Sequence, residues 1–266
     1  MKIRNARGIS VPRWLLVGCI SLVAWTGTAV ADTYLILSLV GDRLTVVGAE
    51  RQVGSNLDRN RQQTVQLNDQ SLDDFAVRAA GAVIQKERPS ASITMLRATD
   101  PTLYSLRDTW LDTDSINAQA LLAVVTKLSP PSSDTRLLLI APRRAELDLS
   151  TDRSHIFTGS KSAGLGFYID QQTPFRSNEA TKIESGRGFL GLFANFQVVL
   201  INLEPAAIEA QENVAVGSTF AAAQAPDKNP WNALSPEQKI RGLQFLLKRE
   251  IERVVPGLLG SAKAQH

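Results

Sequence analysis

The sequence predicts one α/β domain over residues 32–266, built on a mixed sheet with an N-terminal hairpin and a C-terminal helix. Two almost continuous apolar runs of strand length, at residues 34–40 and 136–141, are typical of strands that are buried on both faces. Segments with helical periodicity lie between these runs, which favours parallel strands joined by right-handed crossovers. Shorter β-rich segments follow residue 142 and indicate an antiparallel meander.

The first apolar run is expected to form a hairpin with the segment that follows it. Gly41 and Asp42 separate residues 34–40 from a β-rich run that ends at Val47. Glycine in first place suits a two-residue hairpin turn, because it adopts a positive φ without a steric cost. A short third strand is predicted at residues 62–67.

Two strand–helix–strand passages follow the hairpin. Their elements are a helix at 71–86, a strand at 92–97, a helix that starts at Pro101, a helix at 115–128 and the buried strand at 136–141. Ser71 and Asp74 form an acidic variant of the capping box at the start of the first helix. Asp100 is the expected cap of the second helix, ahead of a proline at its first position.

The C-terminal half is predicted to form the meander. Strands are expected at 164–170, 189–203 and 208–216, with a loop at 171–187. Ser235 and Gln238 predict a capping box at the start of the last helix, which is expected to end at Pro256-Gly257.

The first 31 residues have the pattern of a secretory signal peptide that is cleaved after Ala31. The segment contains no acidic residue, and an apolar core at 14–25 is followed by small residues at 29 and 31; its basic residues are Lys2, Arg4, Arg7 and Arg13. A membrane anchor is the rival interpretation, but the apolar run is shorter than the ~20 residues that cross a bilayer. The mature protein is therefore expected to be periplasmic or secreted, without a stable membrane span.

The single cysteine, Cys19, leaves a second alternative for the N-terminus. Leu16-Val17-Gly18-Cys19 resembles the short motif that precedes a lipidated cysteine, which would make the protein a lipoprotein. The apolar core continues past Cys19 to Trp25, so a cysteine inside the signal peptide is favoured. Loss of Cys19 with the signal peptide would exclude disulfides, thiolate metal sites and cysteine nucleophiles from the mature chain.

Charge excludes nucleic acid as an expected partner. The chain has 29 basic and 26 acidic residues, and four of the basic ones lie in the predicted signal peptide. The remaining chain is nearly neutral and therefore lacks the basic excess that is typical of nucleic-acid-binding proteins.

Two short motifs match the amino-acid pattern of known sites but lack a feature that each site requires. The glycines at 186, 188 and 191 have dinucleotide-loop spacing, but a β-rich segment follows where that motif requires a helix, so no cofactor is predicted. Gly41-Asp42-Arg43-Leu44 resembles the Gly-Asp-Ser-Leu block of SGNH-type hydrolases. Arg43 stands where that family has its nucleophilic serine, and this puts serine hydrolysis in doubt.

Histidine and acidic residues give little support for a catalytic triad or a metal site. The chain has two histidines, of which His266 is terminal, so a Ser-His-Asp site would have to use His155. A zinc site with several His or Cys ligands is excluded within one chain. Asp108, Asp112 and Asp114 allow oxygen-rich cation binding, but a capping role is favoured, and no metal is predicted.

Charged residues follow the three strands that are expected to be parallel. In open α/β sheets, ligands bind beyond the carboxyl ends of such strands. If the three strands are neighbours, their ends meet in a rim suited to an anionic or polyol ligand, although solvated strand ends are the alternative. The predicted ligand-binding residues are Asp42, Arg43, Arg97, Arg143 and Arg144.

Residues 39–58 resemble the opening of a group of uncharacterised exported proteins of Gram-negative bacteria. The resemblance implies export and an α/β fold, and it brings no catalytic residues. The predicted function is a non-catalytic binding or accessory protein of the periplasmic cell envelope, with an envelope protein or a small anionic ligand as partner. The alternative is a hydrolase of an envelope or ester substrate that uses carboxylates such as Asp42.

Overall fold

A computed structural model of the protein describes residues 32–50, 60–113, 115–126, 135–150, 155–179 and 182–261. The predicted signal peptide, including Cys19, lies outside these residues, as does Asp114. Among the residues that the structure describes, every helix is too short or too polar to traverse a lipid bilayer.

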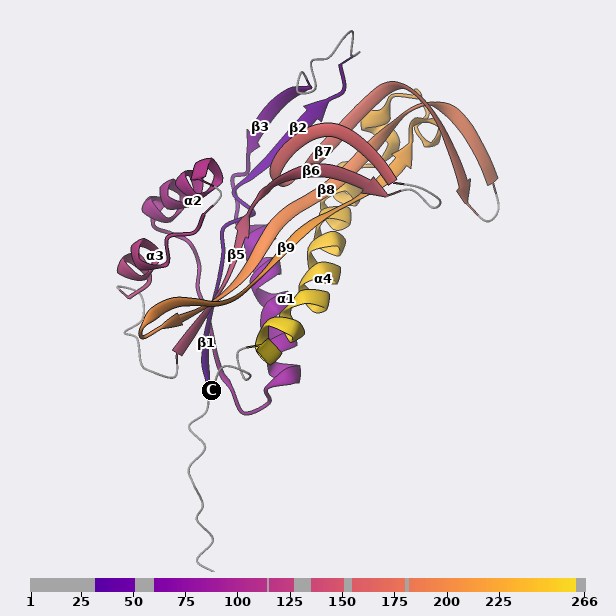
Figure 1. Ribbon diagram of the computed structural model, residues 1–266. Coiled ribbons are helices and arrows are strands. Elements are labelled where there is room, and N and C mark those ends of the chain that lie inside the picture. The colour runs from indigo at the N-terminus through magenta and orange to yellow at the C-terminus, as the bar shows by residue number, and fades with distance from the viewer. Residues whose placement is uncertain are drawn as a thin grey trace, which may run out of the picture. The chain divides into compact units, whose positions relative to one another are not determined.

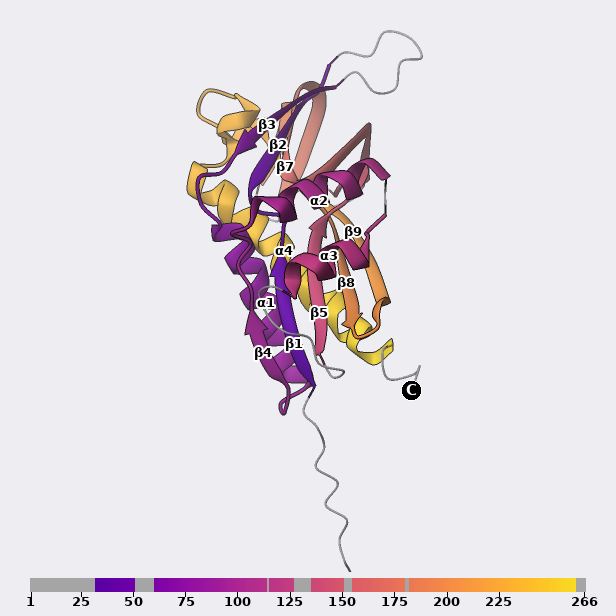
Figure 2. The same ribbon diagram turned by 90° about the vertical axis from the view of Figure 1, so that its left-hand side faces the viewer.

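The predicted mixed α/β architecture is confirmed. The described strands join in one sheet with the order β3-β2-β7-β6-β9-β8-β5-β1-β4, and helices cover it on both sides (Figures 1 and 2). The strands are β1 (Thr33–Ser38), β2 (Arg43–Gly48), β3 (Arg61–Gln66), β4 (Ser92–Met95), β5 (Thr135–Pro142), β6 (Arg144–Ser150), β7 (His155–Glu179), β8 (Lys182–Leu203) and β9 (Ala206–Ala221). The helices are α1 (Ser71–Glu87), α2 (Pro101–Thr113), α3 (Ala118–Val125) and α4 (Pro236–Ser261), and the 3-10 turns are Ala222–Gln224 and Pro230–Ala233.

The three strands predicted to be parallel neighbours are adjacent in the sheet. β1 lies between β5 and β4, and both pairings are parallel, with Leu35 opposite Leu137 on one side and Thr94 on the other. Alternate side chains of β1 enter different cores, as expected for a strand that is covered on both faces. Tyr34 and Ile36 belong to one core, whereas Leu35 and Leu37 belong to the other.

The N-terminal hairpin is present, but its strands differ from those predicted. β2 pairs antiparallel with β3 and parallel with β7, and it does not pair with β1. The predicted two-residue turn at Gly41-Asp42 is therefore wrong. The carboxylate of Asp73 accepts hydrogen bonds from the amides of Val40 and Gly41, both at 2.9 Å, and this holds the chain where it leaves β1 for a distant part of the sheet. Gly41 is required there by close approach, since an added Cβ would lie 2.6 Å from the Asp73 amide nitrogen.

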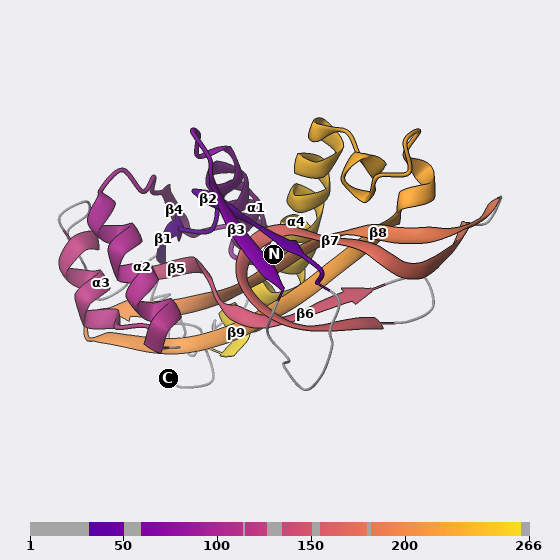
Figure 3. The same cartoon turned by 90° about the horizontal axis from the view of Figure 1, so that it is seen from above.

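The antiparallel meander is confirmed as β7, β8 and β9, with longer strands than predicted. The loop expected at 171–187 is wrong, because β7 and β8 stay paired out to Glu179 and Lys182 after a register shift that follows Asp170 (Figure 3). Pairing of β6 with both β7 and β9 closes a ring of strands. The ring has its own apolar core, which includes Leu149, Phe189 and Phe193.

One predicted helix cap and one predicted helix end are wrong. α1 has Gln70 at its N-cap without a side-chain capping bond, so the Ser71–Asp74 capping box is not formed. α4 begins with the predicted reciprocal bonds between Ser235 and Gln238, but it runs through Pro256 to Ser261. Leu258 and Leu259 are buried, and their packing offsets the hydrogen bond that Pro256 cannot donate.

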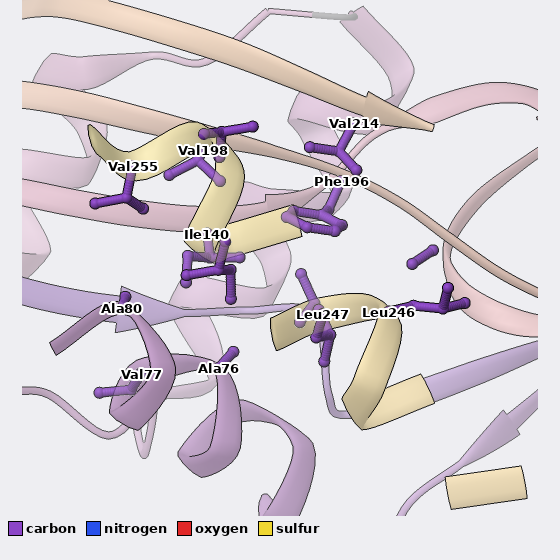
Figure 4. Close-up of a cluster of buried hydrophobic side chains, with 14 of the residues drawn as sticks. Ala76, Val77, Ala80, Ile140, Phe196, Val198, Val214, Leu246, Leu247 and Val255 are labelled. Carbon is purple, nitrogen blue, oxygen red and sulfur yellow. The ribbon is translucent and has the colours of Figure 1, made fainter. Parts of the chain in front are cut away.

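The largest core lies between α1, α4 and one face of the sheet. Figure 4 shows Ala76 and Ala80 of α1 and Leu247 of α4 converging on Ile140 and Phe196 of the sheet. The second core covers the opposite face of β1 and β5 with the buried side chains of α2 and α3, among them Leu103, Trp110, Leu121 and Val125. These two cores hold the carboxyl ends of β1 and β5 in place.

Candidate functional site

A cavity of about 420 Å³ lies beyond the carboxyl ends of β1 and β5. It is bounded by the connection from β1 to β2, by β3, by α2 and by the start of β6 and the middle of β7. We call it the basic cavity, because four of its five charged lining residues are cationic: Asp42, Arg43, Arg107, Arg144 and Lys161. This location agrees with the general position of ligand sites in open α/β sheets.

Two arginines and two aspartates form a ring of ion pairs in the wall of the basic cavity. Arg107 of α2, which is 1 % exposed, pairs with Asp42 and donates from Nη2 to Asp108 Oδ1 at 2.9 Å. Arg43 also pairs with Asp108, and its Nε lies 3.5 Å from Asp42 Oδ2. Arg107 Nη1 donates in addition to the carbonyl of Leu39 at 3.2 Å. The ring therefore ties α2 to the chain that leaves β1.

The carboxylate of Asp42 is fully engaged in this ring. Its Oδ1 faces Arg107 and its Oδ2 faces Arg43. Burial raises the pKa of the Asp42 carboxyl above its ordinary value, while the Arg43 guanidinium opposes the shift. A proton from a substrate would therefore have to compete with two guanidinium groups for the oxygens of Asp42.

A buried carboxylate, Asp73 in the first turn of α1, positions the loop that carries Asp42 and Arg43. Its Oδ1 accepts a hydrogen bond from Ser38 Oγ at 2.6 Å in addition to the two backbone amides described above. Burial raises the pKa of Asp73 to about 6, against the lowering effect of these three donors. Asp73 Oδ2 has no hydrogen-bond partner among the described residues. The side chain is a structural anchor, since it does not line the basic cavity.

A second cavity, also of about 420 Å³, shares Asp42, Arg43 and Arg107 with the basic cavity. Its other lining residues include Asp69, Gln70, Tyr104 and Asp108. Gln70 Nε2 donates to the Ala98 carbonyl at 2.7 Å. Burial raises the pKa of Tyr104 to about 12, so its hydroxyl stays protonated at neutral pH. The ion-pair ring is thus a common wall of two cavities with different charge.

Arg144 and Lys161 complete the basic cavity from β6 and β7. Both side chains are exposed, and neither forms an ion pair with any residue that the structure describes. Arg144 is opposite Ala163 and Glu146 is opposite Lys161 in the antiparallel register. Because alternate residues of a strand share a face, Arg144, Glu146 and Lys161 lie on the same face of the sheet. Glu146 does not line the cavity.

The structure brings three of the five predicted site residues together. Asp42, Arg43 and Arg144 line the basic cavity, whereas Arg97 and Arg143 do not. Arg97 is exposed and pairs with Asp74 of α1, with its Nε 3.1 Å from Asp74 Oδ1. Arg143 lies between β5 and β6, where its backbone amide donates to the Asn195 carbonyl at 3.0 Å.

Sequence reasoning missed Arg107 and Lys161. Arg107 follows Leu103 by four residues and precedes Trp110 by three, so it lies on the apolar stripe of α2. An arginine on such a stripe is a usable signal of a buried ion pair. Lys161 gave no signal, because its place in the cavity depends on the pairing of β6 with β7.

The other motifs do not form sites among the described residues. Gly186 to Gly191 lies within β8, and no helix begins there. No group of three potential metal ligands occurs in the part of the chain that the structure describes. The side chains of Asp112 and His155 lie outside the described set.

Comparison with known proteins identifies no family. No family model matches the chain, and no curated protein matches it. A DUF330 protein of Xanthomonas campestris is similar in structure, with 9% identity, a TM-score of 0.37 and coverage of 88% of this chain and 87% of the other. A hypothetical protein of Chlamydia trachomatis has 10% identity, a TM-score of 0.34 and coverage of 86% and 98%. Both scores are too low to establish a family or a function.

Proposed function

We propose that this chain is an exported, non-catalytic binding protein of the cell envelope that holds a small anionic ligand in the basic cavity. The proposal has two parts, the export of the chain and the binding of an anion. Each part depends on different residues and has its own experiment.

Anion binding is supported by one observation above all, the pair of exposed cations Arg144 and Lys161 at the cavity. Arg43 and Arg107 share their charge with Asp42 and Asp108 through the ion-pair ring. Arg144 and Lys161 lack an ion-pair partner among the described residues, so their charge is available to a ligand. A cleft lined by charge of one sign concentrates ions of the opposite sign. The cavity volume, about 420 Å³, is within the usual range for small-molecule sites.

The same site favours binding over hydrolysis. Within the described part of the chain, Asp42 is the one carboxylate that lines the basic cavity, and both of its oxygens face arginines. A hydrolase of the carboxylate type needs a second acid or a free base within reach of the substrate. An esterase and phosphatase screen of the protein should therefore detect no activity that is lost in Asp42→Asn.

Export is supported by the first 31 residues, with their basic start, apolar core and small residues before Ala31. When the full chain is expressed in a Gram-negative host, the protein recovered from the periplasm should begin at Asp32. Recovery with an intact N-terminus, or with a lipid on Cys19, would contradict this part of the proposal.

Anion binding is tested by the shift in melting temperature that small anions cause. We expect at least one of phenyl phosphate, phenyl sulfate, benzoate and phthalate to raise the melting temperature of the wild-type protein. The double variant Arg144→Gln/Lys161→Gln should lose this shift.

The matched control is Arg78→Gln/Lys86→Gln, which removes the same two residue types from exposed positions of α1 outside the cavity lining. This control should keep the wild-type shift. The absence of any shift in the wild type, or equal shifts in both double variants, would reject anion binding at the basic cavity.

A further inference from the structure

We propose that the ligand of the basic cavity carries a dianionic phosphate monoester group, which Arg144 and Lys161 bind together. This inference rests on the proposed binding function and specifies the chemical class of the ligand. It is derived from the charge count of the cavity and from the register of β6 and β7.

The charge count gives a surplus of two positive charges. Four cations line the cavity, and the ring supplies two carboxylates, Asp42 and Asp108, to the two arginines within it. Arg144 and Lys161 are left without an ion-pair partner among the described residues, and Glu146, which is opposite Lys161 in the register, does not line the cavity. A ligand with two negative charges is attracted by both cations together, whereas a monoanion gains about half of this attraction.

The register places the two cations within reach of one anionic group. Arg144 is directly opposite Ala163, and Lys161 is two residues from Ala163 on the same strand. Such diagonal neighbours on one face of an antiparallel pair are about 7–8 Å apart at the backbone, a span that long side chains bridge. The guanidinium fork of arginine matches two oxygens of a phosphate, and the lysine ammonium adds a third donor.

The remaining walls of the cavity suit a small organic substituent on the phosphate. Val40, Leu111 and Pro142 provide apolar surface, and Thr64 and Gln62 of β3 provide neutral polar groups. A phosphate ester with a ring or short-chain substituent satisfies both kinds of wall. Free inorganic phosphate would use only the charged end of the cavity.

The experiment compares phenyl phosphate with phenyl sulfate, which have the same shape but two charges and one charge at pH 8. Calorimetric titration of the wild-type protein should give a dissociation constant for the phosphate that is at least roughly tenfold lower than that for the sulfate, because the second charge meets a second cation. On lowering the pH from 8 to 5, the preference should disappear as the phosphate takes up a proton near pH ~6. The dissociation constant for phenyl sulfate should not show this change between pH 8 and pH 5.

Substitutions test whether Arg144 and Lys161 cause the preference for phenyl phosphate over phenyl sulfate. Arg144→Gln and Lys161→Gln should each weaken phosphate binding more than sulfate binding, so that the ratio of the two constants falls towards one. Arg144→Lys, which keeps the charge, should restore much of the ratio, and Arg78→Gln should leave it unchanged. Circular dichroism checks that each variant is folded, which is expected because both positions are exposed.

The outcomes separate this inference from the function on which it rests. Equal affinity of the wild type for the two esters, or a ratio that the variants do not change, would overturn the phosphate assignment and leave anion binding intact. Absence of binding for both esters and for the other anions would overturn the binding function itself.

Discussion

Arg107 of α2 forms an ion pair with Asp42, which lies in the connection between β1 and β2. The arginine is almost completely buried, and it is also the residue through which α2 contacts the Leu39 carbonyl. The pair therefore links the position of a helix to the shape of the basic cavity. Removal of either partner would leave a charge in a partly buried place without its counterion.

Replacement of Arg107 by methionine tests this structural role. Methionine fills a similar volume but leaves Asp42 and Asp108 with Arg43 alone, so we expect the free energy of unfolding to fall by about 3 kcal/mol. Urea denaturation measures the change. Arg97→Met is the control, because Arg97 forms an exposed ion pair with Asp74 and should unfold close to the wild type. Similar losses for the two variants would contradict a special role for Arg107.

Asp73 should make stability depend on pH in the weakly acidic range. Its pKa is about 6 in the folded protein, against an ordinary value of 3.8, so between these values the folded state holds a proton that the unfolded state has released. Stability from this group is therefore lost as the pH rises from 4 to 6.

In Asp73→Asn this contribution is absent, and the other carboxyl groups remain. The difference in unfolding free energy between wild type and variant should change by up to about 3 kcal/mol between pH 4 and pH 7, in favour of the variant at the higher pH. Urea denaturation at a series of pH values measures it. A difference that is constant with pH would show that Asp73 titrates at its ordinary value.

Two glycines of neighbouring strands should respond differently to alanine. A Cβ added to Gly166 of β7 would lie 1.9 Å from the Thr45 carbonyl of β2, whereas one added to Gly48 of β2 has its nearest contact at 3.9 Å. We expect Gly166→Ala to destabilise the protein by more than about 2 kcal/mol and Gly48→Ala to be tolerated. Thermal and urea unfolding of the two variants would test this, and a stable Gly166→Ala protein would argue against the pairing of β2 with β7.

Glu146 offers a variant that should gain function. It lies opposite Lys161 and on the same strand face as Arg144, where its charge reduces the attraction for an anion. Glu146→Gln should therefore lower the dissociation constant for phenyl phosphate by roughly two- to threefold. Glu212→Gln, at an exposed position of β9 outside the cavity lining, is the control. Unchanged or weaker binding by Glu146→Gln would place the ligand elsewhere.

The buried strands could be predicted because their signal is local. Residues 34–40 and 136–141 are apolar at nearly every position, and runs of this length are typical of strands covered on both faces. The partner of β2 could not be predicted in this way. Gly41-Asp42 has the composition of a hairpin turn, but Asp73, more than 30 residues later, binds the backbone there and directs the chain away from β1.

The extended part of the β7–β8 hairpin had no sequence signal for a similar reason. Residues 171–187 are polar and lack alternation, so their strand structure depends on backbone pairing with the neighbouring strand. The site residues likewise divide into those that the sequence could locate and those that it could not. Asp42, Arg43 and Arg144 follow strand ends that could be located, whereas Lys161 reaches the cavity only through a register that the sequence does not encode locally.

The ring of Asp42, Arg43, Arg107 and Asp108 has two sides, and each side faces a different cavity. A molecule that draws Arg43 away from Asp108 in one chamber changes the charge presented to the other chamber. Thermodynamic linkage makes such an effect mutual: whatever factor the first occupant imposes on the second, the second imposes on the first. If both cavities hold a ligand, an arginine shared between them would make the two binding equilibria depend on each other.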